Sequence, residues 1–274
     1  MNGIPETGQV NGDPVPEMAC LKFLGTAGAR FVVAKQLRAS GGAYISARGR
    51  QIILDPGPGT IVKCATSRPR IDPAELDGIV LTHAHIDHSN DVNILIDGMT
   101  FGGLKKRGTL FAPRDCLEGK NAVVLNYLKG YLDKIVILEA EQSYELGDLR
   151  FSTSVRHQHP VETYGIKLEL GERRISFMVD TKNFPGLFQS YRDSHILVMN
   201  VVRDTPFENA EIMHLTLKDV KAIVTAIKPQ KTILTHFGMM MLKAKPWLVA
   251  QSLSEELGRE VIAASDGMTV DLLE

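Results

Sequence analysis

The sequence has no long hydrophobic run, and neither sign of charge is in excess. No stretch approaches the roughly 20 apolar residues of a membrane-spanning helix. Residues 1–18 show neither the basic start nor the apolar core of a signal peptide. The 31 basic and 32 acidic side chains give a formal charge of −1, so no global field attracts nucleic acid or anionic lipid. We therefore expect a cytoplasmic protein that is not attached to a membrane.

Cysteine is also scarce. The three cysteines, Cys20, Cys64 and Cys116, are odd in number and widely spaced, which suits neither a disulfide framework nor a CxxC metal site. We expect free, buried thiols, since free cysteine commonly packs as a small hydrophobic residue. No neighbouring residue pattern marks any of them as a nucleophile.

What is present is the composition of an ordinary globular domain, with 44% hydrophobic and 23% charged residues among 274. Residues 1–17 lack periodicity and predict a mobile tail, and residues 18–274, without repeat or linker, predict one α/β domain. We expect strands at 21–25, 42–46, 51–55, 78–83, 109–113, 134–140, 149–155, 164–170, 175–180, 195–201 and 231–236. Helices are expected at 60–67, 93–101, 122–132, 217–227 and 247–257, and a C-terminal hairpin at 261–273 turns at Asp266 and Gly267.

Three of the eight histidines fall in LTHAHIDH, residues 81–88. On an extended strand, residues two apart share a face, so His83 and His85 can meet one ion, with Asp87 along the same edge. His88 joins them only if the chain turns at Ile86 and Asp87. Imidazole and carboxylate are ligands for zinc, iron and manganese. The segment predicts a metal site; the alternative is a polar loop in which histidines cluster by chance.

THAHIDH resembles the H-x-H-x-D-H signature of the metallo-β-lactamase-fold hydrolases, and the resemblance extends over the chain after Leu21. It implies an αββα sandwich, in which helices flank two mixed β-sheets. It also implies two divalent metal ions, with zinc expected and manganese or iron compatible.

The family's other motifs occur in order. Asp55 in ILDPGPGT resembles the carboxylate that orients the ligands, and His159 in RHQHPVETYG, Asp180 in FMVDT and His236 in ILTHFG resemble ligands. The implied sets are His83, His85 and His159 for one metal and Asp87, His88 and His236 for the other, with Asp180 between them. The alternatives are a surface turn for Asp55, a helix cap for Asp180, a core histidine for His236, and His157 in place of His159.

Two histidines remain. His214 precedes a predicted helix 22 residues before His236, and in ribonuclease Z relatives a histidine there assists departure of the leaving group. The resemblance thus implies catalytic roles for His214 and Asp87, although His214 can also be a helix-entry residue. His195 opens an apolar strand and is expected to be structural.

The segments HPVETYG, LTHFG, DGM and FLGTAGAR resemble ribonuclease Z and related small phosphodiesterases. They imply a hydrolase of small or nucleotide-type phosphodiesters. Alternatives are tRNA 3'-end cleavage and a thioesterase or lactonase on the same scaffold. Asp180 follows His159 by only 21 positions, which leaves no room for the tRNA-binding arm of bacterial ribonuclease Z, so RNA is possible but not favoured.

Two further alternatives are weaker. A di-iron oxygen reductase usually has Glu at the position of His85, and a metal-binding regulatory module would not need the complete ligand set. The family implies a possible homodimer. The glycine-rich GTAGAR and DPGPGT match neither nucleotide-binding fingerprint and are expected to be turns near the site.

Overall fold

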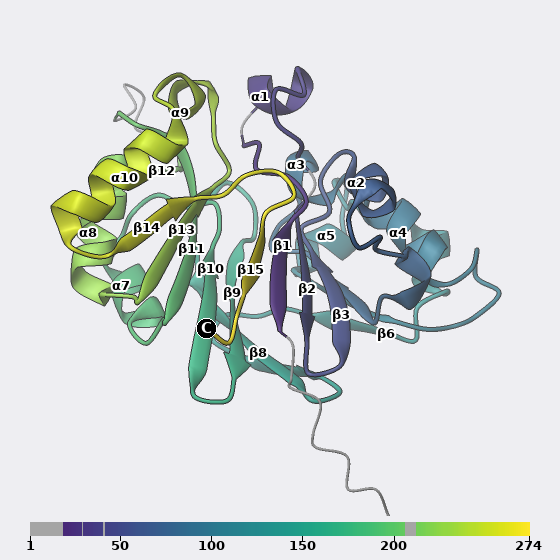
Figure 1. Ribbon diagram of the computed structural model, residues 1–274. Coiled ribbons are helices and arrows are strands. Elements are labelled where there is room, and N and C mark those ends of the chain that lie inside the picture. The colour runs from purple at the N-terminus through teal and green to yellow at the C-terminus, as the bar shows by residue number, and fades with distance from the viewer. Residues whose placement is uncertain (1–18, 29, 41, 206–211) are drawn as a thin grey trace, which may run out of the picture.

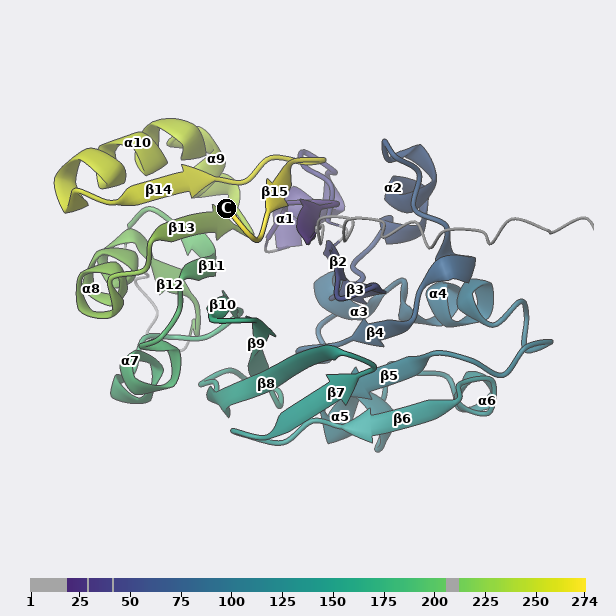
Figure 2. The ribbon, with the colours of Figure 1, turned by 60° about the horizontal axis from the view of Figure 1, so that its bottom comes forward.

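The computed structural model describes residues 19–28, 30–40, 42–205 and 212–274, so the tail predicted at 1–17 lies outside the described residues. Two β-sheets face each other, and helices lie on their outer sides (Figure 1 and Figure 2). This is the αββα sandwich that the resemblance implied.

The first sheet combines an antiparallel hairpin with parallel strands. β2 (Ala43–Ala47) and β3 (Arg50–Leu54) are joined at Arg48 and Gly49, whose φ angles of 51° and 66° suit a type I′ turn. β3 to β6 run parallel, while β1 and β15 pair antiparallel beyond β2. The order is β15-β1-β2-β3-β4-β5-β6, with β1 at Cys20–Phe23, β4 at Gly78–Val80, β5 at Thr109–Ala112, β6 at Lys134–Ile137 and β15 at Thr269–Asp271.

The second sheet has the order β14-β13-β11-β10-β9-β8-β7, with β12 paired to β11. Strands β7 to β10 are antiparallel to one another, and β10, β11, β13 and β14 are parallel. Their bounds are Ser143–Leu146 for β7, Leu149–Arg156 for β8, Tyr164–Leu170 for β9, Arg173–Met178 for β10, Ile196–Arg203 for β11, Leu215–Thr216 for β12, Lys231–Thr235 for β13 and Glu260–Ala263 for β14.

Three hydrophobic layers hold these elements together. Inward residues of both sheets form the central cluster, including Phe23, Ile45 and Ile166. A second cluster packs the first sheet against its helices, and a third packs the second sheet against its own. The helices are α1 Arg30–Ala34, α2 Thr60–Thr66, α3 Ile86–Ser89, α4 Val92–Met99, α5 Arg114–Leu117, α6 Asn126–Lys129, α7 Pro185–Tyr191, α8 Leu217–Ile227, α9 Met239–Lys243 and α10 Pro246–Leu257, with a 3₁₀ turn η1 at Pro73–Glu75.

The longer helices follow from hydrophobic periodicity. α4 buries Val92, Leu95, Ile96 and Met99, the spacing of one helical face. α8 does the same with Val220, Ile223, Val224 and Ile227. In the described part of the chain, no helix has the length and apolar character needed to cross a bilayer.

Three sequence expectations were wrong or incomplete. The predicted C-terminal hairpin does not form: β14 pairs with β13 in the second sheet, and β15 pairs with β1 in the first. The turn itself exists, since the Met268 amide donates to the Ser265 carbonyl at 3.0 Å, but it connects two sheets (Figure 1). The helix predicted at 122–132 is reduced to α6. Cys64 and Cys116 are buried free thiols as expected, whereas Cys20 is only partly buried.

Candidate metal centre

The histidine motif begins just beyond β4 and ends in a short helix. The strand stops at Val80 rather than at His83, and His85 is still extended, with φ −61° and ψ 143°. α3 starts at Ile86, so Asp87 and His88 lie on a helix and Asp87 does not follow a strand edge as predicted. The Ser89 hydroxyl closes this turn by donating to the carbonyls of Ala84 at 3.1 Å and His85 at 3.0 Å.

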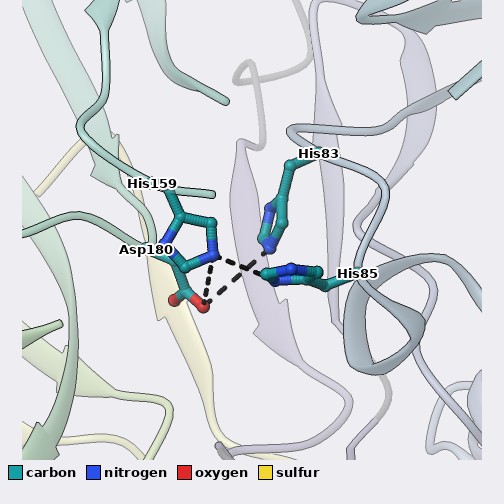
Figure 3. A group of neighbouring side chains, drawn as sticks. All are labelled: His83, His85, His159 and Asp180. Atoms are coloured by element: carbon teal, nitrogen blue, oxygen red, sulfur yellow. Dashed lines mark hydrogen bonds and ion pairs between the residues drawn. The ribbon is translucent and has the colours of Figure 1, made fainter. Parts of the chain in front are cut away.

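One group of four side chains converges from both halves of the sandwich: His83, His85, His159 and Asp180. Figure 3 shows these side chains pointing toward one another, and each offers a ligand atom within 4.8 Å of the others. His85 Nδ1 lies 2.9 Å from His159 Nε2. Asp180 Oδ2 lies 3.9 Å from both His83 Nε2 and His159 Nε2.

A second group, formed by Asp87, His88 and His236, lies beside the first. His88 Nε2 is 3.0 Å from His236 Nε2, which is 3.4 Å from Asp87 Oδ2. Asp180 reaches this group too, with Oδ2 3.6 Å from His88 Nε2 and Oδ1 3.7 Å from His236 Nδ1. Asp180 therefore lies between the two groups, in the position that the resemblance implied.

Asp55 holds the motif in place. It follows β3 with a φ of 53°, and its carboxylate accepts hydrogen bonds from the Thr82 amide at 2.7 Å and the Thr82 hydroxyl at 2.6 Å. His88 Nδ1 lies 3.0 Å from the same carboxylate. Asp55 also lies within ligand distance of His83 and His88, but its oxygens are already engaged by these protein donors.

Three imidazoles share one arrangement, in which Nδ1 is held and Nε2 faces the centre. Their Nδ1 atoms lie 3.0 Å from the Thr82 hydroxyl for His83, 3.0 Å from Asp55 for His88, and 3.2 Å from the Met213 carbonyl for His159. Such partners fix the tautomer of a metal-ligating histidine.

Burial sets the protonation of the first group. Desolvation, together with the neighbouring His88 imidazole, holds the pKa of His83 well below its ordinary value, and desolvation lowers the pKa of His159 to about 4. These imidazoles are neutral near neutral pH, so their lone pairs are available. Desolvation opposes the charge on Asp180, but the surrounding imidazoles outweigh it and hold the pKa of that carboxyl well below its usual range.

The residues present fit a pair of cations. His83 Nε2 and His236 Nδ1 are buried and have no hydrogen-bond partner among the described residues, a state that is costly unless another group satisfies them. Neutral imidazoles and ionised carboxylates are the donor set that zinc, iron and manganese accept. Two groups sharing Asp180 match the expectation of a dinuclear site.

His236 is held by a glycine that the sequence did not single out. The residue follows β13 with a φ of 61°, and Gly28 packs directly on it: a Cβ at position 28 would lie 2.2 Å from His236 Nδ1. The Gly28 amide donates to the Phe237 carbonyl at 3.1 Å, and the Phe237 amide donates to Thr26 at 2.9 Å. Gly28 of GTAGAR thus lies close to the site, as expected, and its lack of a Cβ permits the close approach.

The remaining histidines differ in position. His214 Nδ1 lies 3.6 Å from Asp180 Oδ2, and 21% of its side chain is exposed. His157 is a core residue whose Nε2 lies 2.8 Å from the Tyr191 hydroxyl and whose Nδ1 lies 3.2 Å from the Asp180 carbonyl, and it is absent from the ligand groups. His195 accepts from the Arg174 amide at 3.1 Å, just before β11 begins, which agrees with a structural role.

Sequence reasoning missed two residues that orient the centre, Thr82 and Asn200. The Asn200 amide donates to Asp180 Oδ1 at 2.8 Å, and Thr82 contacts both Asp55 and His83. Thr82 follows the apolar strand β4, and Asn200 is a polar residue within the apolar strand β11, and this was the available signal.

Comparison with known proteins agrees with the fold and the motif. Residues 50–237 match the family model described as "Beta-lactamase superfamily domain". The chain is 31% identical over 258 residues to an uncharacterized protein of Methanocaldococcus jannaschii, covering 92% of this chain and 94% of that protein.

Two further relatives are more distant. A ribonuclease Z of Thermoplasma acidophilum is 29% identical over 138 residues, which cover 48% of this chain and 43% of that enzyme. The crystal structure of a diphosphatase from the PhnP family matches with a TM-score of 0.66 at 22% identity, covering 92% of this chain and 96% of that one. The chain therefore belongs to the metallo-β-lactamase superfamily and is a metal-dependent hydrolase with a histidine and aspartate metal site.

Proposed function

We propose that the protein is a dinuclear phosphodiesterase that hydrolyses a small or nucleotide-type phosphodiester. The observation that carries the proposal is the pair of ligand groups that share Asp180. We assign His83, His85 and His159 to one ion, Asp87, His88 and His236 to the other, and Asp180 to both. Two divalent ions held by these residues would make a water nucleophilic near neutral pH and would stabilise the negative charge of a displacement at phosphorus.

The chain's own residues supply orientation and a proton. Asp55, Thr82 and Asn200 fix the rings and the shared carboxylate through the contacts described above. The side chain of His214 is 21% exposed, whereas that of Asp180 is 2% exposed, and His214 Nδ1 lies 3.6 Å from Asp180 Oδ2. A phosphodiester bound beside Asp180 would therefore lie near His214. We assign it the protonation of the departing alkoxide, a role typically worth about 10² to 10⁴ in rate. We assign to Asp87, which lies 3.4 Å from His236 Nε2, the role of holding the attacking water.

The relatives support a phosphorus substrate over an acyl one. The diphosphatase of the PhnP family and the ribonuclease Z are both named for phosphorus chemistry, and HPVETYG and LTHFG are local resemblances to that branch. A tRNA substrate is less favoured because Asp180 follows His159 by only 21 positions and the formal charge is −1, whereas nucleic-acid binding draws on many phosphate contacts.

The test is a substrate panel with metal-loaded protein. We expect hydrolysis of bis(p-nitrophenyl) phosphate and of a cyclic nucleotide, and slower or no cleavage of precursor tRNA, thioesters and lactones. A preparation with two ions per chain that turns over thioesters or lactones but neither diester would overturn the proposal. Faster cleavage of precursor tRNA than of the small diesters would assign the ribonuclease Z activity instead.

The variant His214→Ala tests whether His214 protonates the leaving group without also binding a metal ion. We expect a loss of about 10² to 10⁴ in kcat on a cyclic nucleotide, whose alkoxide needs a proton, and a much smaller loss on bis(p-nitrophenyl) phosphate, whose phenolate departs readily. Metal content should stay at the wild-type value. Equal losses on both substrates would contradict the assignment.

A further inference from the structure

A basic pocket lies on the outer face of the first sheet, away from the metal centre. Along β1 the side chains alternate: Phe23 joins the core between the sheets, while Lys22 and Leu24 line a cavity of about 240 Å³ on the other side. The end of α2 and the turn at Asp266 complete it, with Lys63, Ser67 and Arg68 in its wall. None of the residues that line this pocket lines the cavity beside His88 and His236.

Lys22 is the unusual member of this pocket. Only 8% of the residue is exposed, and its ammonium donates to the Arg68 carbonyl at 2.9 Å. Among the described residues, no carboxylate forms an ion pair with it. A buried charge without a charged partner is costly. An ammonium has three donors, so two remain beyond the bond to the Arg68 carbonyl.

The other groups of the pocket also call for an acceptor with negative charge. Ser67 Oγ is buried and has no hydrogen-bond partner in the described part of the chain. The carboxylate in the wall, Asp266, is engaged elsewhere: it accepts from the Thr26 hydroxyl at 2.7 Å and the Ala39 amide at 2.7 Å. Lys63 and Arg68 add positive charge.

We propose that this basic pocket binds a phosphoryl group, either as inorganic phosphate or on a small phosphate monoester. Lys22 and Ser67 donate to its oxygens, and Lys63 and Arg68 supply screening charge at the rim. The ligand provides the counter-charge that the described residues do not give to Lys22. The assignment does not depend on the substrate of the metal centre.

Equilibrium dialysis of metal-loaded protein against radiolabelled phosphate is the direct test. We expect one phosphate more per chain in the wild type than in Lys22→Met, which keeps the apolar stem and removes the charge. The affinity of this site should fall about tenfold or more, because a charge-assisted hydrogen bond is lost. Lys106→Met, at an exposed lysine, is the matched control and should bind like the wild type.

Thermal unfolding distinguishes this role from a structural one. Lys22→Met should melt at a higher temperature than the wild type in phosphate-free buffer, because an unpaired buried charge has gone, and added phosphate should raise its Tm less. Ser67→Ala should weaken phosphate binding without lowering Tm. Glycerol phosphate in the same assays distinguishes the two sources: tighter binding than phosphate assigns an ester, weaker binding the free anion. Unchanged phosphate stoichiometry and affinity in Lys22→Met, or a lower Tm with an undiminished phosphate response, would overturn the proposal.

Discussion

At the residue scale, the candidate centre depends on groups that lie outside the two proposed ligand sets. Asp55, Thr82 and the Met213 carbonyl hold one nitrogen of His88, His83 and His159, which leaves the other nitrogen directed inward. The geometry of the ligands is therefore prepared before an ion arrives. Loss of such a holding contact should change metal affinity more than it changes the fold.

Asp55→Asn tests this directly. Removing the charge that holds His88 Nδ1 should weaken metal binding at the Asp87, His88 and His236 group by about 10-fold to 100-fold, while the group around His83 retains its ion. Titration against a competing chelator measures both constants. Asp193→Asn, at an exposed carboxylate, is the control, and equal affinities in the two variants would contradict the assignment of Asp55.

Gly28→Ala tests the close packing on His236. The added Cβ would lie well inside contact distance of the ring and of the His236 carbonyl, so we expect about 1–3 kcal/mol less stability, with a lower metal content. Urea unfolding and metal analysis provide the two readings. Gly130→Ala is the matched control, because a Cβ there meets only the Tyr127 carbonyl at 3.8 Å. Wild-type stability in Gly28→Ala would show that the segment moves aside without cost.

The histidine motif could be recognised from sequence because its chemistry is local: four side chains that can bind a metal fall within six residues. The structure brings these side chains near His159, Asp180 and His236, which the resemblance implied. Gly28, Thr82 and Asn200 could not be recognised in this way, since their importance arises from contacts with residues far along the chain. Asn200, for example, can donate to Asp180 only because β11 pairs with β10, the strand that ends just before Asp180.

At the element scale, strand pairing explains why the predicted C-terminal hairpin does not form. The segment at 261–273 has every local feature of a hairpin, yet each of its strands pairs with a partner that is distant in sequence or already part of another sheet. Local turn chemistry specifies the turn but not the sheet. The helix expected at 122–132 failed similarly, because Val123 and Val124 donate their amides to the Cys116 carbonyl instead of continuing a helix.

We expect the first turn of α8 to fix the position of His214, which lies two residues before its N-cap Thr216. Thr216 and Asp219 form a capping box, with the Thr216 amide donating to Asp219 Oδ2 at 2.9 Å, two residues after His214. Asp219→Ala should cost about 1 kcal/mol of stability and lower kcat on a cyclic nucleotide more than on bis(p-nitrophenyl) phosphate. Lys218→Ala, exposed on the same turn, is the control. A stability loss with equal effects on both substrates would limit the cap to a structural role.

At the scale of the whole molecule, the buried thiols link stability to pH. Burial, with a smaller effect from Asp91, raises the pKa of Cys64 from 9.0 to about 12. The folded state therefore keeps a proton that the unfolded chain releases, so this contribution is complete below about pH 9 and is lost as the pH rises toward about 12.

We expect the free energy of unfolding to fall between pH 9 and about pH 12, and to fall less steeply in Cys64→Ala. Urea unfolding at several alkaline pH values measures both slopes. In the native protein at about pH 8, Cys64 and Cys116 should resist thiol reagents, and all three cysteines should react after unfolding. Rapid native labelling of Cys64, or identical slopes in the two proteins, would contradict the burial argument.

The two sheets contribute unequal shares of one centre. The segments after β3 and β4 of the first sheet carry five of its residues, Asp55, His83, His85, Asp87 and His88. The segments after β8, β10 and β13 of the second sheet carry the other three, His159, Asp180 and His236. Neither share alone forms the shared site. An ion that binds only the native arrangement lowers the free energy of that arrangement in proportion to the logarithm of its concentration over Kd. Metal supply would thus add to the stability that the central hydrophobic cluster already gives the two halves of the sandwich, and chelation would remove that addition.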